Sequence, residues 1–202
     1  TFVTHDSPEA LHLYRHSTAH LMAAAVTALF PEAQCGIGPP TDEGFFYDFI
    51  VNRPFVPEDL IAVEQKMKEF AAQNLPFERR MLSKEEAKDH FHGKAEPLKV
   101  QLIDEKGGAV VSCYTIGEIF LDFCTGPHVP STGRLKAFKV LNSSNAYWKG
   151  DAQNQPMQRI YGTAFFKESA LKTHLHRLEE AKKRDHRKLG KELGLFTFHQ
   201  FA

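Results

Sequence analysis

Residues 7–30 read SPEALHLYRHSTAHLMAAAVTALF, and the rest of the chain is organised around this stretch. Ser7 is a good N-cap, Pro8 suits the first helical position, and Pro31 stops a helix. The pattern therefore predicts one helix that extends to about Phe30. A stripe of mostly apolar residues recurs at helical spacing and should face the core: Leu11, Tyr14, Thr18, Leu21, Met22, Ala25 and Leu29.

Two histidines, His16 and His20, lie on roughly the opposite face of this helix, with Ala23 beside them. Positions i and i+4 of a helix lie one above the other, so the two imidazoles would point to the same place. The small Ala23 can leave room for a ligand, or it can reflect helix propensity alone. The segment Cys124-Thr-Gly-Pro-His128 repeats the four-residue offset in a loop bounded by prolines.

Four nitrogen and sulfur side chains in two such pairs match a metal site of one cysteine and three histidines. They equally match a metal-free cluster for general acid–base chemistry. Both interpretations place the two pairs in one functional site. The alternative is a solvated histidine pair and an unrelated buried thiol. Asp122 falls on the same face of its predicted strand as Cys124, where a carboxylate could orient a histidine.

The composition is that of an ordinary globular protein, since 42% of the 202 residues are hydrophobic and 25% are charged. The 25 basic and 25 acidic residues cancel, so affinity for nucleic acid must come from local patches. Three cysteines give no credible disulfide framework, and we find no signal peptide or membrane-spanning stretch. We expect a reducing, cytoplasmic setting. Because the chain starts with Thr1 and stops on an apolar run, we also expect a piece of a longer protein.

Predicted helices dominate the chain up to about residue 105. Residues 45–50, FFYDFI, predict a strand that is buried on both sides. Residues 77–81 predict a further strand, and Ser83 with Glu86 predicts a capping box for a short helix. Between these strands, residues 57–74 predict a helix with an apolar side formed by Leu60, Ile61, Met67 and Phe70.

Residues 98–103 fit a helix or a strand equally well, because periodicity alone does not decide so short an apolar run. Lys99 lies inside this segment, and burial there could lower its pKa. After residue 107 the pattern changes to short antiparallel strands at 110–114, 119–124, 136–141, 146–149 and 157–166.

The helical half, about 7–105, and the β-rich half, about 107–166, together predict one α+β domain over residues 1–166. We expect an antiparallel sheet with long helices packed on it and the site at the junction of the two halves. Residues 167–202 should form a basic linker helix, with its helical part from about 168 to 189. Between residues 167 and 191 there are nine Lys or Arg against four Asp or Glu. Such a run is either a solvated face or a contact with phosphates, in which case the candidates are Lys182, Lys183, Arg184, Arg187 and Lys188.

Several stretches are together highly specific for one family. They are Arg15-His-Ser-Thr-Ala-His-Leu21, Ile37-Gly-Pro39, Gly44-Phe-Phe-Tyr-Asp48, Asp122-Phe-Cys-Thr-Gly-Pro-His-Val-Pro130, Ala146-Tyr-Trp-Lys-Gly-Asp151, Gln158-Arg-Ile-Tyr-Gly-Thr-Ala164 and Lys183-Arg-Asp-His-Arg-Lys-Leu-Gly190. With these stretches the chain resembles the editing region of bacterial-type threonyl-tRNA synthetases over nearly its whole length. The HxxxH and CxxxH pairs alone are shared with the editing domains of alanyl-tRNA synthetases.

The resemblance implies the fold of those editing domains and hydrolysis of mischarged seryl-tRNA(Thr). A site that selects threonine loses only about 1–3 kcal/mol on the methyl that serine lacks, so a second sieve must complete the discrimination. Carried over residue by residue, the family's pocket corresponds to His16, His20, Lys99, Asp122, Cys124 and His128, with Tyr47, Ala23, Gly126 and Pro127 next to the substrate.

The chain departs from the family pattern at both ends. It stops before any class II catalytic motif, so we expect an aminoacyl-tRNA deacylase that does not itself form threonyl-tRNA. The ubiquitin-like domain that usually comes first is missing or reduced to Phe2-Val3. The expected partner is tRNA(Thr) carrying serine, without any membrane. The full-length enzyme is expected to be a homodimer through the absent catalytic domain.

For the chemistry we expect a water molecule, deprotonated by His16 or His20, to attack the ester while Lys99 stabilises the oxyanion. In this scheme Cys124 is a pocket wall, and no metal is required. Zinc held by His16, His20, Cys124 and His128 is the alternative, as the alanyl relatives suggest. Two other hypotheses are a Cys–His acyl hydrolase and a tRNA-binding or zinc-stabilised module without chemistry of its own.

Overall fold

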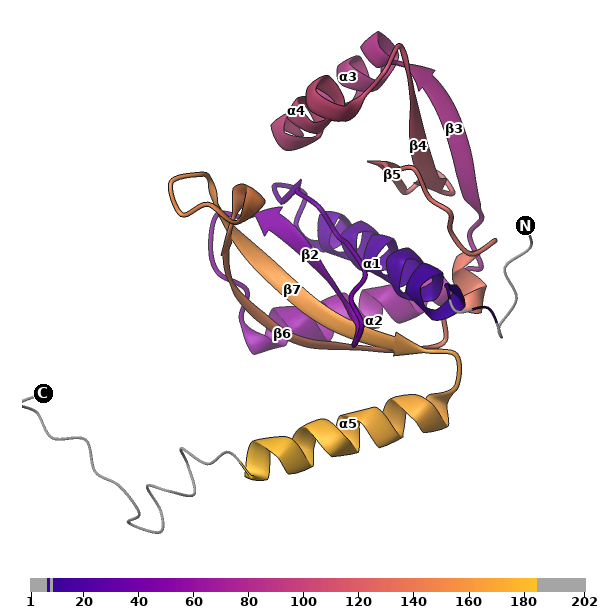
Figure 1. The fold of residues 1–202 in the computed structure, drawn as a ribbon, viewed down its shortest axis with the longest axis vertical. Coiled ribbons are helices and arrows are strands. Elements are labelled where there is room, and N and C mark those ends of the chain that lie inside the picture. Colours follow the sequence, from indigo (N-terminus) through magenta and orange to yellow (C-terminus); the bar gives the residue numbers. More distant parts are fainter. Residues whose placement is uncertain (1–6, 8, 185–202) are drawn as a thin grey trace, which may run out of the picture.

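The computed structural model describes residue 7 and residues 9–184, and this part of the chain has the expected α+β fold with two antiparallel sheets. Figure 1 labels its elements. They follow in the order α1 (Ala10–Leu29), β1 (Gln34–Cys35), β2 (Phe45–Ile50), α2 (Pro57–Ala72), β3 (Phe77–Ser83), α3 (Lys84–Gly93), α4 (Pro97–Lys106), β4 (Val110–Ile116), β5 (Phe120–Phe123), β6 (Ala137–Tyr147), β7 (Pro156–Phe165) and α5 (Glu168–Lys183), with short 3₁₀ turns at Thr132–Arg134 and Trp148–Gly150.

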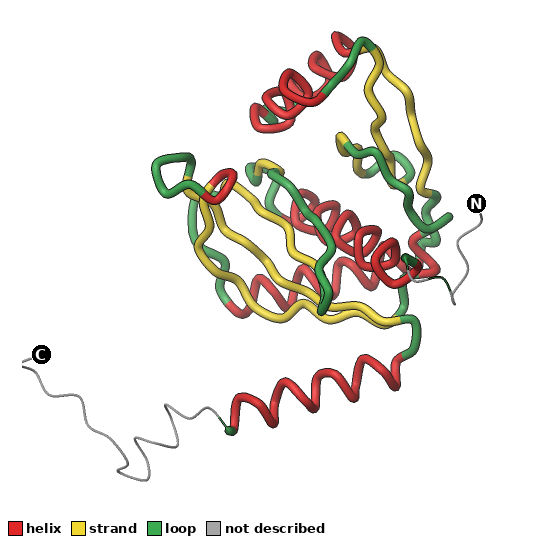
Figure 2. The backbone as a smooth tube through the Cα atoms, in the orientation of Figure 1, coloured by secondary structure: helices red, strands yellow, loops and turns green. Residues whose placement is uncertain are grey.

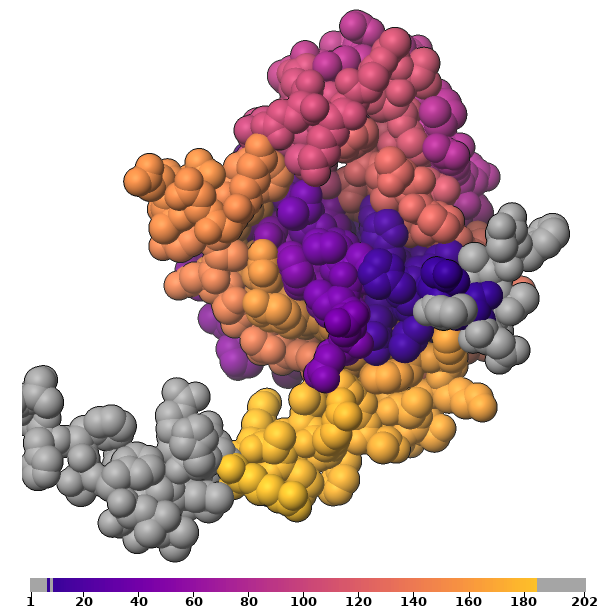
Figure 3. Space-filling model, viewed as in Figure 1, coloured from indigo at the N-terminus to yellow at the C-terminus, as the bar shows by residue number. Residues whose placement is uncertain are grey.

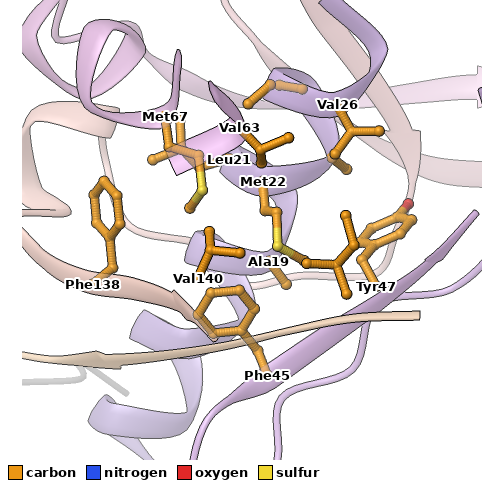
Figure 4. Packing of buried hydrophobic residues seen from close by; sticks show 14 of the residues in the cluster. Ala19, Leu21, Met22, Val26, Phe45, Tyr47, Val63, Met67, Phe138 and Val140 are labelled. Atoms are coloured by element: carbon orange, nitrogen blue, oxygen red, sulfur yellow. The ribbon is translucent and has the colours of Figure 1, made fainter. Parts of the chain in front are cut away.

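The main body is a four-stranded sheet with the strand order β1-β2-β7-β6. Helices α1 and α2 cover one face, and α5 packs against β6 and β7 on the other side (Figure 1). The core lies between the sheet and the two long helices, where Met22, Met67, Phe45 and Val140 are buried (Figure 4). Tyr47 is at the edge of this core, with its ring wholly buried.

A smaller unit, which we call the lobe, comprises residues 77–123. It contains the sheet β3-β4-β5 with α3 and α4 packed on one face around Phe91, Ile103 and Val111. The tube view separates the lobe from the main body (Figure 2). Its two connections to the body lie side by side, because the Phe77 amide donates to the Pro130 carbonyl and the Thr132 amide donates to the Leu75 carbonyl.

The helical and β-rich halves expected from the sequence interleave in space. Strand β2, from the first half, pairs with β7 from the second, in a register that sets Tyr47 opposite Ile160. Strand β3 likewise pairs with β4 over its full length. The boundary near residue 106 therefore runs through both sheets.

Several expected elements need correction. Helix α1 begins at Ala10 with Glu9, not Ser7, at the N-cap position; the Ala10 amide donates to the Ser7 carbonyl. The ambiguous stretch 98–103 is part of helix α4. The two strands expected at 136–141 and 146–149 are one strand, β6, because the polar residues between them continue the pairing with β7 past a bulge at Val140/Asn142.

Two details of burial and length also differ from the expectation. Ile61 is 71% exposed, since α2 turns Val63 and Met67 to the core instead. Strand β2 is fully buried on the face that carries Phe45 and Tyr47, whereas Phe46 and Ile50 on the other face are only partly buried. Helix α5 is described to Lys183, so the rest of the helix predicted to about 189 lies outside the described residues.

The space-filling view shows a hollow where the lobe meets α1 and the main body (Figure 3). The expected pocket residues, in contrast to the basic candidates of α5, come from both sides of this junction. Among the helices of the described residues, none combines the length and the apolar character that crossing a membrane requires.

Candidate functional site

The two sequence pairs come together at the junction between the lobe and the main body. His16 and His20 are on α1, and Cys124 and His128 are in the loop that follows β5. Each side chain offers one ligand atom, and these four atoms lie within 4.8 Å of one another. The Cys124 Sγ is 3.5 Å from His16 Nε2 and 3.4 Å from His128 Nε2. The loop thus places a sulfur between two imidazoles.

The conformation of the loop depends on Gly126. Its φ is +69°, a left-handed conformation that suits glycine, and a Cβ there would be 2.5 Å from the ring of Tyr114. The Gly126 amide donates to the Cys124 Sγ at 3.2 Å. A tight turn packed on Tyr114 therefore directs Cys124 and His128 to the same point.

Each histidine has a partner on the side away from the cluster. The Ser17 hydroxyl donates to the Leu13 carbonyl at 2.9 Å and lies 3.2 Å from His128 Nδ1. Because a hydroxyl has one proton, Nδ1 of His128 must donate to it, which leaves Nε2 unprotonated toward Cys124. The His16 imidazole bonds to the backbone of Pro127, and His20 Nδ1 lies 3.6 Å from the Asp122 Oδ2.

A buried ionic network lies behind His20. The Lys99 ammonium of α4 contacts the Asp122 carboxylate of β5 and donates to the Tyr47 hydroxyl at 2.9 Å. The Tyr47 hydroxyl in turn donates to Asp122 at 2.5 Å. Lys99 and Asp122 are each only 2% exposed, so each charge depends on the other for compensation.

Burial and neighbouring charges keep the three imidazoles neutral. Desolvation lowers the pKa of His16 and, more strongly, the pKa values of His20 and His128. Interactions with His16 and Lys99 lower the pKa of His20 further, and interactions with His20 and His16 do the same for His128. The two histidines of α1 also differ in their accessibility to water. His20 is 3% exposed, whereas His16 is only partly buried. Of the two histidines on α1, His16 is therefore the one that a water molecule reaches more readily.

The expectation that the pKa of Lys99 is lowered overall is wrong. Desolvation does act in that direction, but Asp122 beside the ammonium outweighs it, and the pKa of Lys99 is raised. Lys99 therefore carries a positive charge at neutral pH. For Cys124, burial and the charge of Asp122 raise the thiol pKa to about 12, so the side chain is a neutral thiol and a poor nucleophile.

The remaining candidate residues are distributed as follows. Tyr47, expected next to the substrate, is fully buried and bridges Lys99 and Asp122. Ala23 is fully buried in the main core. Pro127 is exposed and Gly126 is partly buried beside the cluster.

The basic candidates lie apart from the cluster, at the end of α5. Lys182, Lys183 and Arg184 are exposed there, and Lys183 and Arg184 pair with Glu180. Arg187 and Lys188 lie outside the described residues.

Sequence reasoning missed several neighbours of the histidines. Ser17 positions His128, as described, and it lies inside the His16–His20 motif, so its place between the two histidines was an available signal. The rings of Phe77 and Tyr114 enclose His128, and Phe120 packs against His20. These aromatic residues are on strands of the lobe, and nothing in their spacing pointed to the site.

The cluster also fits a zinc ion. In a tetrahedral site with one sulfur and three nitrogen ligands, sulfur and nitrogen are about 3.5 Å apart, close to the two distances from Cys124 Sγ. The outer partners Ser17 and Asp122 are of the type that orient ligand histidines. His16, His20, Cys124 and His128 would hold the ion.

The comparisons with known proteins relate the chain to aminoacyl-tRNA synthetases. Residues 111–161 match the model of the threonyl and alanyl tRNA synthetase second additional domain. This segment contains Asp122, Cys124 and His128, and it excludes the two histidines of α1. The matched segment therefore carries three of the site residues, and Lys99 lies outside it as well.

Curated relatives extend the match to nearly the whole chain. The chain is 54% identical over 196 residues to the threonine–tRNA ligase of Pelobacter propionicus, covering 97% of this chain and 31% of the relative. It is 53% identical over 203 residues to that of Teredinibacter turnerae, covering 100% of this chain and 32% of the relative. Nearly the whole chain thus matches one region of threonine–tRNA ligases, and it spans about a third of the length of these relatives.

Proposed function

We propose that this chain hydrolyses the ester bond of seryl-tRNA(Thr) and so removes serine that has been attached in place of threonine. The observation that carries the proposal is a neutral, partly accessible imidazole, His16, next to a buried network with a permanently charged Lys99. Together these groups supply a base for water and a positive charge for the oxyanion, as ester hydrolysis requires. We assign residues 1–166 to this editing domain and residues 167–202 to a basic linker.

The first step of the reaction falls to His16. A water molecule bound to this imidazole gives up a proton to the unprotonated ring nitrogen and attacks the ester carbonyl. The bond from the carbonyl carbon to the ribose oxygen then breaks, and the imidazolium returns the proton to that oxygen, which leaves as a hydroxyl. The other nitrogen bonds to the backbone of Pro127, which has only a carbonyl acceptor, so the imidazole donates there and its tautomer is set. His20 is almost fully buried and serves to hold the cluster together.

The negative charge that develops on the ester oxygen is stabilised by the network behind the cluster. Lys99 has three N–H donors, and within the described residues Asp122 and Tyr47 are its two partners. We propose that the remaining donor and the charge act on the oxyanion. Asp122 fixes Lys99 and lies near His20, and Tyr47 keeps both charges in place.

The thiol of Cys124 acts as a pocket contact, because its raised pKa leaves almost no thiolate at neutral pH. We propose that no metal is essential. A zinc ion, if bound, would supply a Lewis acid at the four-residue cluster. The geometry that fits zinc also supports a second candidate function, a zinc-stabilised module that binds tRNA without cleaving it.

Dialysis against a strong chelator separates these functions. Under the proposal, serine release continues after elemental analysis shows that zinc is gone. Activity that disappears and returns only with added zinc contradicts the metal-free mechanism, and tRNA binding without any turnover supports the module.

The main test compares two esters of the same tRNA. We expect the chain to release serine from Ser-tRNA(Thr) at least about tenfold faster than threonine from Thr-tRNA(Thr), because a methyl that must be excluded costs about 1–3 kcal/mol. The measurement is the first-order rate of amino-acid release with the enzyme in excess. A His16→Ala variant is the control for uncatalysed hydrolysis. Equal rates for the two esters contradict the proposed selection of serine over threonine.

We further propose that the basic end of α5 contacts the phosphate backbone of the tRNA. Lys182, Lys183 and Arg184 are exposed there, and the first has no acidic partner among the described residues. Neutralising all three should weaken tRNA binding and flatten its salt dependence by about one unit of slope per lost contact. Neutralising the partly buried Lys66 and the exposed Lys68 of α2 is the control. An unchanged slope would leave α5 as a solvated face. In the full-length enzyme we expect the homodimer interface to lie in another domain.

A further inference from the structure

Glu96 is a half-buried carboxylate at the start of α4 that the proposed reaction leaves unused. It occupies the N-cap position of this helix, yet its side chain makes no capping bond there. Instead its Oε2 accepts a hydrogen bond from the backbone amide of Cys35 at 2.6 Å. Cys35 belongs to β1, which in the described part of the chain pairs with β2 alone. Glu96 thus connects the lobe to the edge of the main body.

The same helix makes a second connection one turn later. Lys99 follows Glu96 by three residues, so both side chains lie on one face of α4. Lys99 donates to the hydroxyl of Tyr47 in β2, two residues before Phe49, the residue that pairs with Cys35. The first turn of α4 is therefore attached at two points to the β1–β2 pair.

We propose that Glu96 is a positioning residue that holds the ammonium of Lys99 in register with Tyr47 and Asp122. This inference rests on the proposed deacylase function. Lys99 has a flexible stem of four carbons, and the hydrogen bond to Tyr47 alone does not fix the helix from which the stem extends. A displacement of about 1 Å at a catalytic group can cost roughly 100-fold in rate. The Glu96 attachment restricts that displacement.

The charged and titratable groups around Glu96 make this attachment depend on pH. Cys35 faces it from β1, Tyr47 from β2, Lys99 from α4 and Asp122 from β5. Burial raises the pKa of Glu96 to about 7, with the nearby Asp122 adding to the rise and the Cys35 amide and Lys99 opposing it. Above that pH the carboxylate is ionised and is the stronger acceptor for the Cys35 amide.

The test compares Glu96→Ala and Glu96→Gln in the whole chain, with the exposed Glu85→Ala of α3 as the matched control. Glu96→Ala should lower kcat for Ser-tRNA(Thr) by about 10- to 100-fold and leave KM within about twofold, because the group acts on geometry and does not bind substrate. Glu96→Gln retains an acceptor oxygen and should restore most of kcat. The rise of wild-type kcat through about pH 7 should persist in Glu85→Ala and be absent in Glu96→Gln.

A double-mutant cycle isolates the route through Lys99. In a Lys99→Ala background, Glu96→Ala should cost nothing further, because the group that it positions is gone. A full, additive loss in that background overturns the proposal, and so does a Glu96→Ala variant with the kcat of the wild type.

A second readout does not depend on the reaction. Acylation of Lys99 by acetic anhydride, measured by mass spectrometry against the exposed Lys94, should be slow in the wild type and in Glu96→Gln and several-fold faster in Glu96→Ala. If the wild type releases no serine, the proposed function fails, and this labelling still decides the positioning role. Equal labelling in all three proteins overturns it.

Discussion

The site has two halves that differ in how far water reaches them. The histidine–cysteine half is partly open at His16, Cys124 and His128, and its groups are neutral. The half formed by Lys99, Tyr47 and Asp122 is at most 2% exposed and contains a complete ion pair. A base that must exchange protons with water needs access, whereas a fixed charge acts most strongly where water is excluded. In the proposed deacylase the two halves therefore have different chemical roles, and variants of each half should fail in different ways.

The largest effect should follow from Lys99→Ala. This change removes the oxyanion group and leaves Asp122 buried without its counter-charge, so it should lower the rate by about 100-fold or more and destabilise the fold by about 3–5 kcal/mol. Single-turnover kinetics and urea unfolding measure the two effects. A variant that loses rate but keeps its full stability would show that the buried half is not the electrostatic unit described above.

His16→Ala tests the histidine–cysteine half of the site. Loss of the base should again lower the rate by about 100-fold, whereas stability should change by less than about 1 kcal/mol because His16 is partly exposed. Cys124→Ser in the same half should be milder in both respects, since the neutral thiol takes no covalent part. A trapped thioester, together with a Cys124→Ser variant as inactive as Lys99→Ala, would assign the chemistry to the thiol.

A smaller effect than that of Lys99→Ala concerns the stability of the buried half as a function of pH. The pKa of Glu96 is raised from 4.5 to about 7 in the folded chain, so its contribution to stability is present below pH 4.5 and is lost as pH rises through 7. Glu96→Gln has no charge to bury, so relative to the wild type it should become more stable by about 1–3 kcal/mol between pH 5 and pH 8. Urea unfolding at the two values tests this, with Glu85→Ala as the control that should show no such change.

Local sequence patterns predicted helices and strands well where a single local signal was enough to define them. The aromatic alternation of residues 45–50 matches β2, Pro57 begins α2, and Ser83 with Glu86 forms the capping box of α3. The polar run from Asn142 to Asn145 resembles a turn, but it pairs with β7 and continues β6, because tertiary pairing overrides local turn preference.

The candidate site, too, could be predicted from the sequence in one part and not in another. The two motifs with a four-residue offset placed His16, His20, Cys124 and His128 in one cluster, and the structure brings them together. The sign of the pKa shift of Lys99 could not be predicted from the sequence. It depends on Asp122, a partner that only the folding of the lobe brings to the ammonium.

The side-by-side connections of the lobe have a consequence for how the site assembles. The chain leaves the main body after Leu75 and returns at Thr132, where the two strands of backbone are hydrogen-bonded to each other. The lobe is thus an insertion into the main body, and it can fold as a separate unit. The lobe and the segment that returns from it contain Lys99, Asp122 and Cys124. The main body contains His16, His20 and Tyr47. A site split in this manner does not exist until both units have folded and docked, so the return of activity during refolding is a direct report on docking.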